Sequence, residues 1–309
     1  MGYIEKSAEF SAQRLELLRS ELIAKVPSDQ IVVTCGSYAR RDASVSSDLD
    51  YFTIVPEEGG QPADAEIAKV VDRIIGKAPS RDGAFANTTT ANDLLRNFGG
   101  SNDSNATITR RMLFLLEGDY LTNQESFSAL RVSIIERYVD ETKLDHQIAF
   151  YLLNDLIRYW RTLAVDYAQK TYGTNNPKPW AIRNVKLVFS RKLIYASGLF
   201  SVALTADRTR DAKVELLSKL FAMTPIERIK YVCGESASER ACQLYEYFLE
   251  QIGNKTTRDH LEILHRDHKE TDKIFRNIKN EGHYFSRELF GLFESTFHSS
   301  HPIHMAVVF

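Results

Sequence analysis

The feature that most constrains this chain is a Gly-Ser dipeptide, Gly36-Ser37, placed between two apolar segments and followed by an Asp-x-Asp pair. The first segment, residues 31–35, is short and rich in β-branched residues, which is typical of a buried strand that ends at a tight turn. Asp48 and Asp50 open the second segment, and ten residues separate Ser37 from Asp48. The pattern predicts two strands joined by a turn and a short helix.

These residue types favour the binding of phosphate and metal ions. Asp48 and Asp50 would point the same way from a strand, because side chains alternate with a period of two. Two neighbouring carboxylates repel each other unless they share divalent cations. Gly36 allows a phosphate to approach the backbone, Ser37 adds a hydroxyl, and a short helix beginning near Tyr38 would direct its positive end at the same anion. We therefore expect a nucleoside triphosphate bound with two Mg²⁺ ions, for which Mn²⁺ can substitute.

The motif resembles the signature of the polymerase-beta nucleotidyltransferase superfamily. More narrowly, Gly-Ser-x-Ala-Arg-Arg followed by Ser-Asp-Leu-Asp, ending at Asp50, is similar to nucleotidyltransferases related to the bacterial uridylyltransferases that modify nitrogen-regulatory PII proteins. The resemblance is close over residues 30–56 and thinner to about residue 140. It implies transfer of a nucleoside monophosphate from a nucleoside triphosphate to a hydroxyl acceptor, with release of pyrophosphate.

The resemblance also implies the metal-binding and catalytic residues. Asp48 and Asp50 would hold the metal ions, and a member of the superfamily normally adds a third carboxylate from a later strand. The apolar run 112–116 ends in an acid, so we expect Glu117 to be that carboxylate. If the run is a helix instead, Glu117 only caps or solvates its end, and Asp103 in the preceding loop becomes the alternative.

Phosphate-binding residues are expected in both halves of the chain. In the core they are Gly36, Ser37, Arg40 and Ser47. Residues 167–206 contain no Asp or Glu, which makes this part of the chain locally basic. Helical periodicity places Arg158 and Arg161 on one stripe, and Arg183 and Lys186 with Ser190 on another. By resemblance, a helical domain closes one wall of the nucleotide cleft, so these four cations would hold the triphosphate. Alternatively, they lie on solvated helix faces or form salt bridges.

The expected fold is α+β, a small mixed sheet followed by an α-helical bundle. We expect an N-terminal helix within 1–29, a nucleotidyltransferase core at 30–140 and a helical domain at 141–309. The expected helices are 8–24, 63–77, 144–169, 180–204, 211–222, 225–232, 236–252, 256–278 and 283–297. A further strand is expected at 83–86, with loops at 57–62 and 98–105. In the first helix, Phe10, Leu17, Leu18 and Leu22 share the apolar face.

Composition excludes several classes. A formal net charge of −2 and a pI near 6.5 argue against a bulk DNA-binding protein. No apolar window reaches the roughly 20 residues of a membrane span, and no signal peptide is recognisable, so we expect a cytoplasmic protein without a membrane partner. The three cysteines, Cys35, Cys233 and Cys242, are too few for a disulfide framework. The histidine clusters at 265–268 and 298–304 are interpreted as incidental surface residues.

The acceptor stays open at this point. By resemblance it is a hydroxyl of a protein or an RNA. The same core also supports joining nucleotides into a small signalling molecule. A third hypothesis is a catalytically weak protein that binds nucleoside triphosphate and regulates a partner, because an obvious third carboxylate is missing from the sequence.

Overall fold

A four-stranded mixed sheet forms around the Gly-Ser dipeptide, in the order β3-β2-β1-β4. The computed structural model describes residues 2–57, 62–77, 88–96, 98–99, 102–139, 144–172 and 178–308. The strands are β1 (Ile31–Cys35), β2 (Asp50–Val55), β3 (Thr89–Thr90) and β4 (Asp119–Tyr120). Strand β1 is antiparallel to both β2 and β4, and β2 is parallel to β3. With the many helices around it, this sheet confirms the expected α+β class.

Beyond its first two residues, the chain divides into two compact units. Unit 1 contains residues 3–144 and 209–224, and unit 2 contains residues 145–208 and 225–309. The segment 209–224 carries helix α10 (Arg210–Phe221), which contacts α5 and α6 of unit 1. The expected helical domain at 141–309 therefore differs from unit 2 by this helix.

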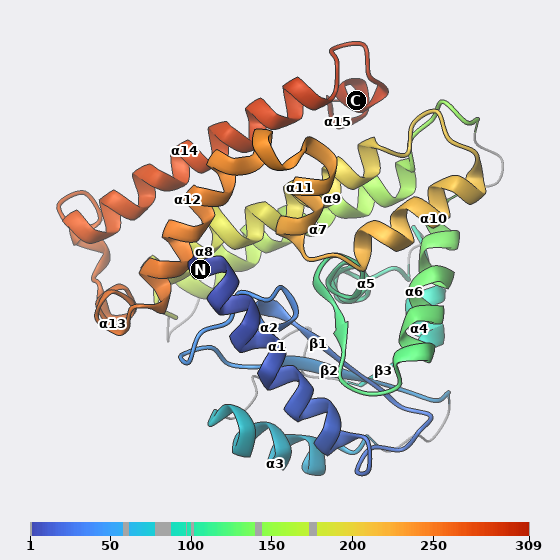
Figure 1. Ribbon diagram of the computed structural model, residues 1–309, viewed down its shortest axis with the longest axis horizontal. Helices are drawn as coiled ribbons and strands as arrows, with labels where there is room; N and C mark the ends of the chain where they lie inside the picture. Colours follow the sequence, from blue (N-terminus) through green and yellow to red (C-terminus); the bar gives the residue numbers. More distant parts are fainter. Residues whose placement is uncertain are drawn as a thin grey trace. The chain divides into compact units, whose positions relative to one another are not determined.

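Unit 1 places two helices on one face of its sheet (Figure 1). Its helices are α1 (Tyr3–Leu22), α2 (Gly36–Ala39), α3 (Asp64–Ile75), α4 (Ala91–Leu95), α5 (Asn105–Glu117), α6 (Gln124–Tyr138) and α10. Helices α1 and α3 contact each other, and their apolar residues join Val32 of β1 and Tyr51 of β2 in one buried cluster. The outer surface of these helices carries ion pairs such as Lys69 with Glu66 at 2.7 Å and Arg73 with Glu21.

The N-terminal helix and α3 form close to where the sequence predicts them. In α3, Ile67, Val70 and Val71 form the buried face. In α1, Leu18 and Leu22 are buried as expected, but Leu17 is 50% exposed and does not belong to the face. The predicted strand at 83–86 and most of the loop at 57–62 lie outside the described residues.

The apolar run that precedes Glu117 is a helix, so the expectation of a strand there is wrong. Helix α5 begins after Ser104, whose hydroxyl accepts a hydrogen bond from the backbone N–H of Thr107 at 3.1 Å. This N-cap satisfies a backbone donor that has no partner within the helix. All residues from Met112 to Leu116 are buried, which removes the amphipathic period that distinguishes a helix from a buried strand.

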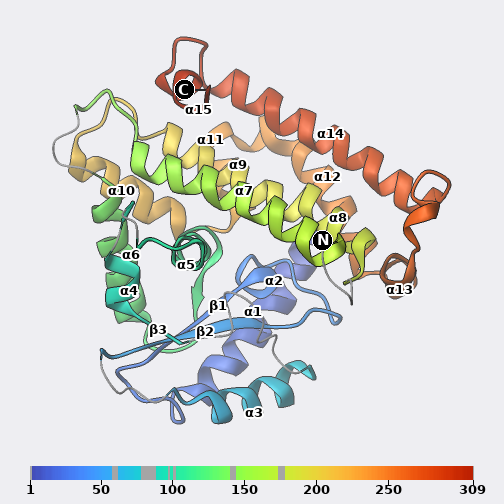
Figure 2. The same ribbon diagram turned by 180° about the vertical axis from the view of Figure 1, so that it is seen from behind.

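Unit 2 is helical throughout the part that the structure describes (Figure 2). Its helices are α7 (Phe150–Tyr172), α8 (Trp180–Lys186), α9 (Lys192–Ala203), α11 (Pro225–Cys233), α12 (Glu235–Gly253), α13 (Lys255–Ile263), α14 (Lys273–Thr296) and α15 (Pro302–Val308). The core contains the ring of Phe189 between those of Phe248 and Phe285, with centroids 4.7 and 5.3 Å away. None of the helices in the described ranges is long and apolar enough to cross a bilayer.

Two of the long helices expected in unit 2 are interrupted. The predicted helix at 180–204 contains a π-helical turn, Leu187–Arg191, between α8 and α9. The predicted helix at 256–278 ends at Ile263, and α14 then runs from Lys273 beyond the predicted break near residue 280. Asp272 caps α14, since its carboxylate accepts from the N–H of Phe275 at 2.7 Å. Helix α7 begins at Phe150 rather than at residue 144.

Candidate functional site

The turn after β1 brings the backbone of Gly36 against the carboxylate of Asp50. Cys35 and Asp50 are paired across β1 and β2, and the Thr34 hydroxyl donates to the backbone carbonyl of Asp50 at 3.0 Å. Gly36 has a φ of +74°, and a Cβ at this position would lie 2.9 Å from Oδ2 of Asp50. Only glycine satisfies both the positive φ and the close approach. The structure therefore fixes a carboxylate directly at the Gly-Ser turn.

Ser37 is the second residue of the short helix expected after the turn. Helix α2 has only four residues, so it contributes little of a helix dipole. The backbone carbonyl of Ser37 accepts a hydrogen bond from the N–H of Asp42 at 2.9 Å, and this bond joins the two ends of segment 37–42. Its side chain is half-buried, and its hydroxyl makes no hydrogen bond to any described residue. That hydroxyl is available to a ligand.

Asp48 lies outside the strand, in contrast to the expected shared strand face with Asp50. Strand β2 begins at Asp50, and Asp48 is exposed on the segment before it. Its carboxylate forms no hydrogen bond or ion pair with the described part of the chain. Burial, and to a smaller extent the charge of Asp48, raises the pKa of Tyr38 to about 12. The charge of Arg14 acts in the opposite direction and lowers it. The charge of Asp48 therefore acts on Tyr38, the residue after Ser37.

Ser47 holds the loop that leads to these carboxylates. Its hydroxyl accepts from the backbone N–H of Ser44 at 3.0 Å, and its own N–H donates to the Ser44 carbonyl at 2.9 Å. The side chain expected to contact phosphate is therefore used in a local turn.

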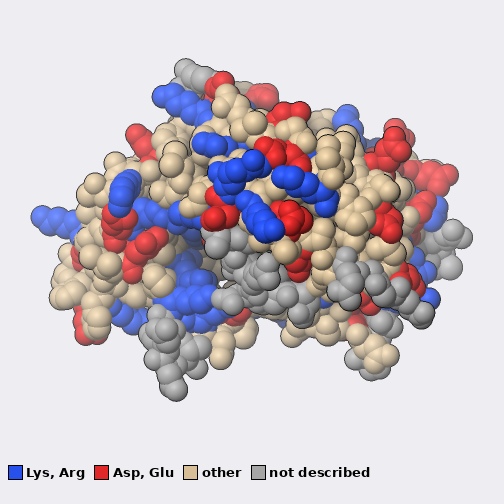
Figure 3. Space-filling model, turned by 90° about the horizontal axis from the view of Figure 1, so that it is seen from below, with Lys and Arg blue, Asp and Glu red and all other residues tan. Residues whose placement is uncertain are grey.

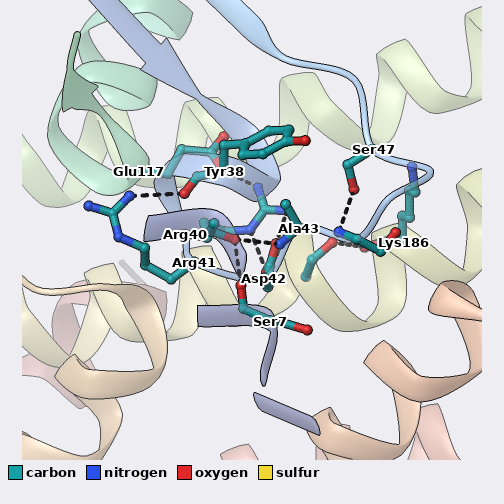
Figure 4. Close-up of polar contacts among 12 residues, drawn as sticks. Ser7, Tyr38, Arg40, Arg41, Asp42, Ala43, Ser47, Glu117 and Lys186 are labelled. Carbon is teal, nitrogen blue, oxygen red and sulfur yellow. Dashed lines mark hydrogen bonds and ion pairs between the residues drawn. The ribbon is translucent and has the colours of Figure 1, made fainter. Parts of the chain in front are cut away.

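Arg40 is enclosed by carboxylates (Figure 4). Its guanidinium donates from Nε and Nη2 to the two oxygens of Asp42 at 2.9 and 3.1 Å, and from Nη1 to Oε2 of Glu117. Arg40, Asp42 and Glu117 are all buried. Arg40, expected to bind phosphate, and Glu117, expected to bind metal, are instead found bonded to each other.

The alternative third carboxylate is also bonded to an arginine. Asp103 accepts from Nη2 of Arg111 at 2.6 Å and from the N–H of Gly99 at 3.0 Å, and the side chains of Asp103 and Arg111 are fully buried. Over the described ranges, no three His, Cys, Asp or Glu side chains converge in a way that could hold a metal ion.

A second ion-pair network, which sequence reasoning missed, involves Asp119 of β4. Its Oδ2 accepts from Arg41 at 2.7 Å and from Arg19 at 2.8 Å. The Arg19 guanidinium also lies 4.0 Å from the centroid of the Tyr120 ring. Arg41 has a φ of +64°, uncommon for a residue with a side chain, and the second bond of its guanidinium, to the carbonyl of Tyr38 at 3.0 Å, supports that conformation. No sequence motif signals this network, because its members come from three distant segments.

The four cations expected to bind phosphate in unit 2 lie at two different heights along the axis of α7. Helices α7 and α8–α9 pack antiparallel, since Trp160 stacks on Tyr195 at 5.2 Å and Asn184 donates to the Tyr167 hydroxyl at 3.1 Å. Arg158 and Arg161 lie near the first of these contacts, and Arg183 and Lys186 lie near the second. At 1.5 Å of rise per residue, the two levels are separated by roughly 10 Å along the helix.

The individual side chains of these cations differ. Arg158 donates to Oδ1 of the buried Asp155 at 3.2 Å, and Arg161 is exposed. Ser190, expected on the stripe with Arg183 and Lys186, is buried, and its hydroxyl donates to the Lys186 carbonyl at 3.0 Å. The π-helical turn accounts for this, because its extra residue shifts everything beyond Lys186 out of the 3.6-residue period.

The sequence matches no protein-family model and no curated protein.

Proposed function

We propose that this chain is a Mg²⁺-dependent nucleotidyltransferase that transfers a nucleoside monophosphate from a nucleoside triphosphate to a hydroxyl acceptor and releases pyrophosphate. The observation that carries the proposal is the contact between Gly36 and the carboxylate of Asp50. Asp48, which is exposed, lies two residues before Asp50 in the chain, and the half-buried Ser37 follows Gly36 in the turn. A carboxylate fixed at a Gly-Ser turn is the feature that supports this proposal.

The donor set fits magnesium. Mg²⁺ is usually held by one or two carboxylates together with substrate phosphates and water, and Asp48 and Asp50 supply two carboxylates. When bound, the metal would activate the acceptor hydroxyl and neutralise charge on the leaving pyrophosphate. The protein would contribute the carboxylates, the Ser37 hydroxyl as a donor to the phosphates, and space for them at Gly36.

A second candidate is a protein that binds nucleoside triphosphate but turns it over slowly, and regulates a partner. It is favoured by the arginine contacts of both candidate third carboxylates, Glu117 with Arg40 and Asp103 with Arg111. With two carboxylates instead of three, metal and nucleotide binding would persist while transfer would slow.

Labelled nucleotides separate these functions. The purified protein is incubated with each α-labelled nucleoside triphosphate and Mg²⁺ or Mn²⁺, with and without cell extract, and the products are resolved by size. Label in protein or RNA identifies a macromolecular acceptor, small nucleotidase-resistant products identify a synthase of a signalling nucleotide, and binding without product identifies the regulatory protein.

The Asp48→Asn variant controls this assay. It should abolish the metal-dependent product, whereas Asp72→Asn, which neutralises an exposed carboxylate on α3, should leave it unchanged. Equal product from Asp48→Asn and the unmodified protein would reject the metal assignment.

A further inference from the structure

Helix α14 approaches the π-helical turn of unit 2 closely at Gly282. A Cβ on Gly282 would lie 2.5 Å from Cγ1 of Val188 and 3.1 Å from the ring of Phe189. Lys279 and Ser286 lie three residues before and four residues after Gly282, so they share its face of the helix. The close approach brings both within reach of α8 and α9.

Two lysines form hydrogen bonds between α14 and the helices α8 and α9. Lys279 of α14 donates to the side-chain oxygen of Asn184 in α8 at 2.7 Å. Lys192 of α9 donates to the hydroxyl of Ser286 in α14 at 2.6 Å. Both acceptors are held in place, because Asn184 donates to the Tyr167 hydroxyl at 3.1 Å and Ser286 donates to the Gly282 carbonyl at 2.7 Å. The ammonium positions are therefore set by a bonded network.

The two ammonium groups have neutral acceptors and no ion-pair partner among the described residues. Both side chains are half-buried. Burial lowers the pKa of Lys192, and burial together with the nearby charge of Lys192 lowers the pKa of Lys279. An ammonium has three N–H donors, and each of these groups uses one of them in the described network. Both lysines thus keep N–H donors to spare where α14 meets α8 and α9.

We propose that Lys192 and Lys279 form a binding site for a phosphoryl anion on unit 2. Such an anion would relieve the repulsion between the two ammonium groups and accept their remaining hydrogen bonds. The site does not depend on the proposed transferase activity, since all of its residues belong to unit 2. Free pyrophosphate and the phosphate tail of a nucleotide both carry the required chemistry.

The test is a calorimetric titration of the full chain at neutral pH with pyrophosphate and, separately, with ATP, both in the presence of EDTA. We expect Lys192→Gln and Lys279→Gln each to weaken binding roughly tenfold or more, as the loss of a hydrogen bond to a charged group should. Lys255→Gln removes an exposed lysine of unit 2 that pairs with Asp259, and it should bind like the unmodified protein. Asp72→Asn, on helix α3 of unit 1, should also bind normally, because it removes no residue of either proposed site.

The ligand arms distinguish the source of the phosphate. The double variant carries both Lys192→Gln and Lys279→Gln. If it no longer binds pyrophosphate, the site accepts free phosphoryl anions. If it loses only the binding of ATP, the site accepts the phosphate tail of a nucleotide. Thermal unfolding without ligand checks that the double variant folds; its Tm should not fall, because replacing partly desolvated charges is often neutral or stabilising. Equal affinity in the double variant and the unmodified protein, or no binding of either ligand, would overturn the proposal.

Discussion

At the scale of single residues, the space that a side chain would occupy on Gly36 is taken by the carboxylate of Asp50. Gly76 provides a matched comparison, because its φ is also +74° but no atom lies within 4 Å of its missing Cβ. The two positions separate the cost of the backbone conformation from the cost of the contact.

We predict that Gly36→Ala is more destabilising than Gly76→Ala. The left-handed conformation alone should cost Gly76→Ala roughly 1–2 kcal/mol. Gly36→Ala should lose about 1–3 kcal/mol more, the usual cost of overpacking, because Asp50 must move. Urea unfolding of both variants measures the difference, and equal losses would show that the contact is not fixed.

Glu117 is predicted to have a structural role whether or not metal is present. Glu117→Gln removes a carboxylate that pairs with the buried guanidinium of Arg40, and breaking a buried pair costs about 3–5 kcal/mol. The loss should be measurable by urea unfolding in EDTA. A variant as stable as the unmodified protein in EDTA would instead favour a role for Glu117 in metal binding.

The sequence predicts residues that act within one short segment and misses those that meet across the fold. Gly36, Ser37, Asp48 and Asp50 are recognisable because their spacing is itself the signal. The contact between Arg40 and Glu117 spans 77 residues, and no local pattern reports a pairing over that distance. Alternation alone does not locate the first hydrogen-bonded residue of a strand, so it predicts Asp48 inside β2, which begins at Asp50.

At the scale of elements, the packing of α14 on the π-helical turn depends on one glycine. We predict that Gly282→Ala destabilises the protein by about 1–3 kcal/mol, because the added methyl group meets Val188. Gly291→Ala, in the same helix with open space around it, should stabilise by about 0.5–1 kcal/mol through helix propensity.

The double variant Gly282→Ala with Val188→Ala tests the cause. It should recover part of the loss, because the smaller residue at 188 makes room for the added methyl group. Thermal unfolding is measured for Gly282→Ala, for Val188→Ala and for the double variant. A double variant that loses more stability than the two single variants lose together would reject the packing argument.

Helices and strands whose apolar residues recur with a regular period can be predicted from the sequence, and those without such a period cannot. Strand β1 and helix α3 follow their patterns, whereas α5 is apolar on all sides over its last turns and was assigned to a strand. The cap at Ser104 was the available signal. The π-helical turn has no sequence signature, so the stripe containing Arg183, Lys186 and Ser190 was extended through it incorrectly.

At the scale of the whole molecule, the charge is nearly balanced, with 39 Lys and Arg against 41 Asp and Glu. Figure 3 shows basic side chains interspersed with acidic ones on the face that it presents. We predict no retention of duplex DNA in a gel-shift assay at physiological salt, since non-specific binding requires neutralising many phosphates. Retention that weakens steeply as salt increases would contradict this prediction.

We propose that Asp48 and Asp50 support metal-dependent transfer from a nucleoside triphosphate. The most direct measurement is the rate of pyrophosphate release from each nucleoside triphosphate as Mg²⁺ is added, with the acceptor fraction from the labelling assay present. We predict release that requires Mg²⁺, persists in Asp72→Asn and disappears in Asp50→Asn. Pyrophosphate release that continues in EDTA, or at an unchanged rate in Asp50→Asn, would contradict the account.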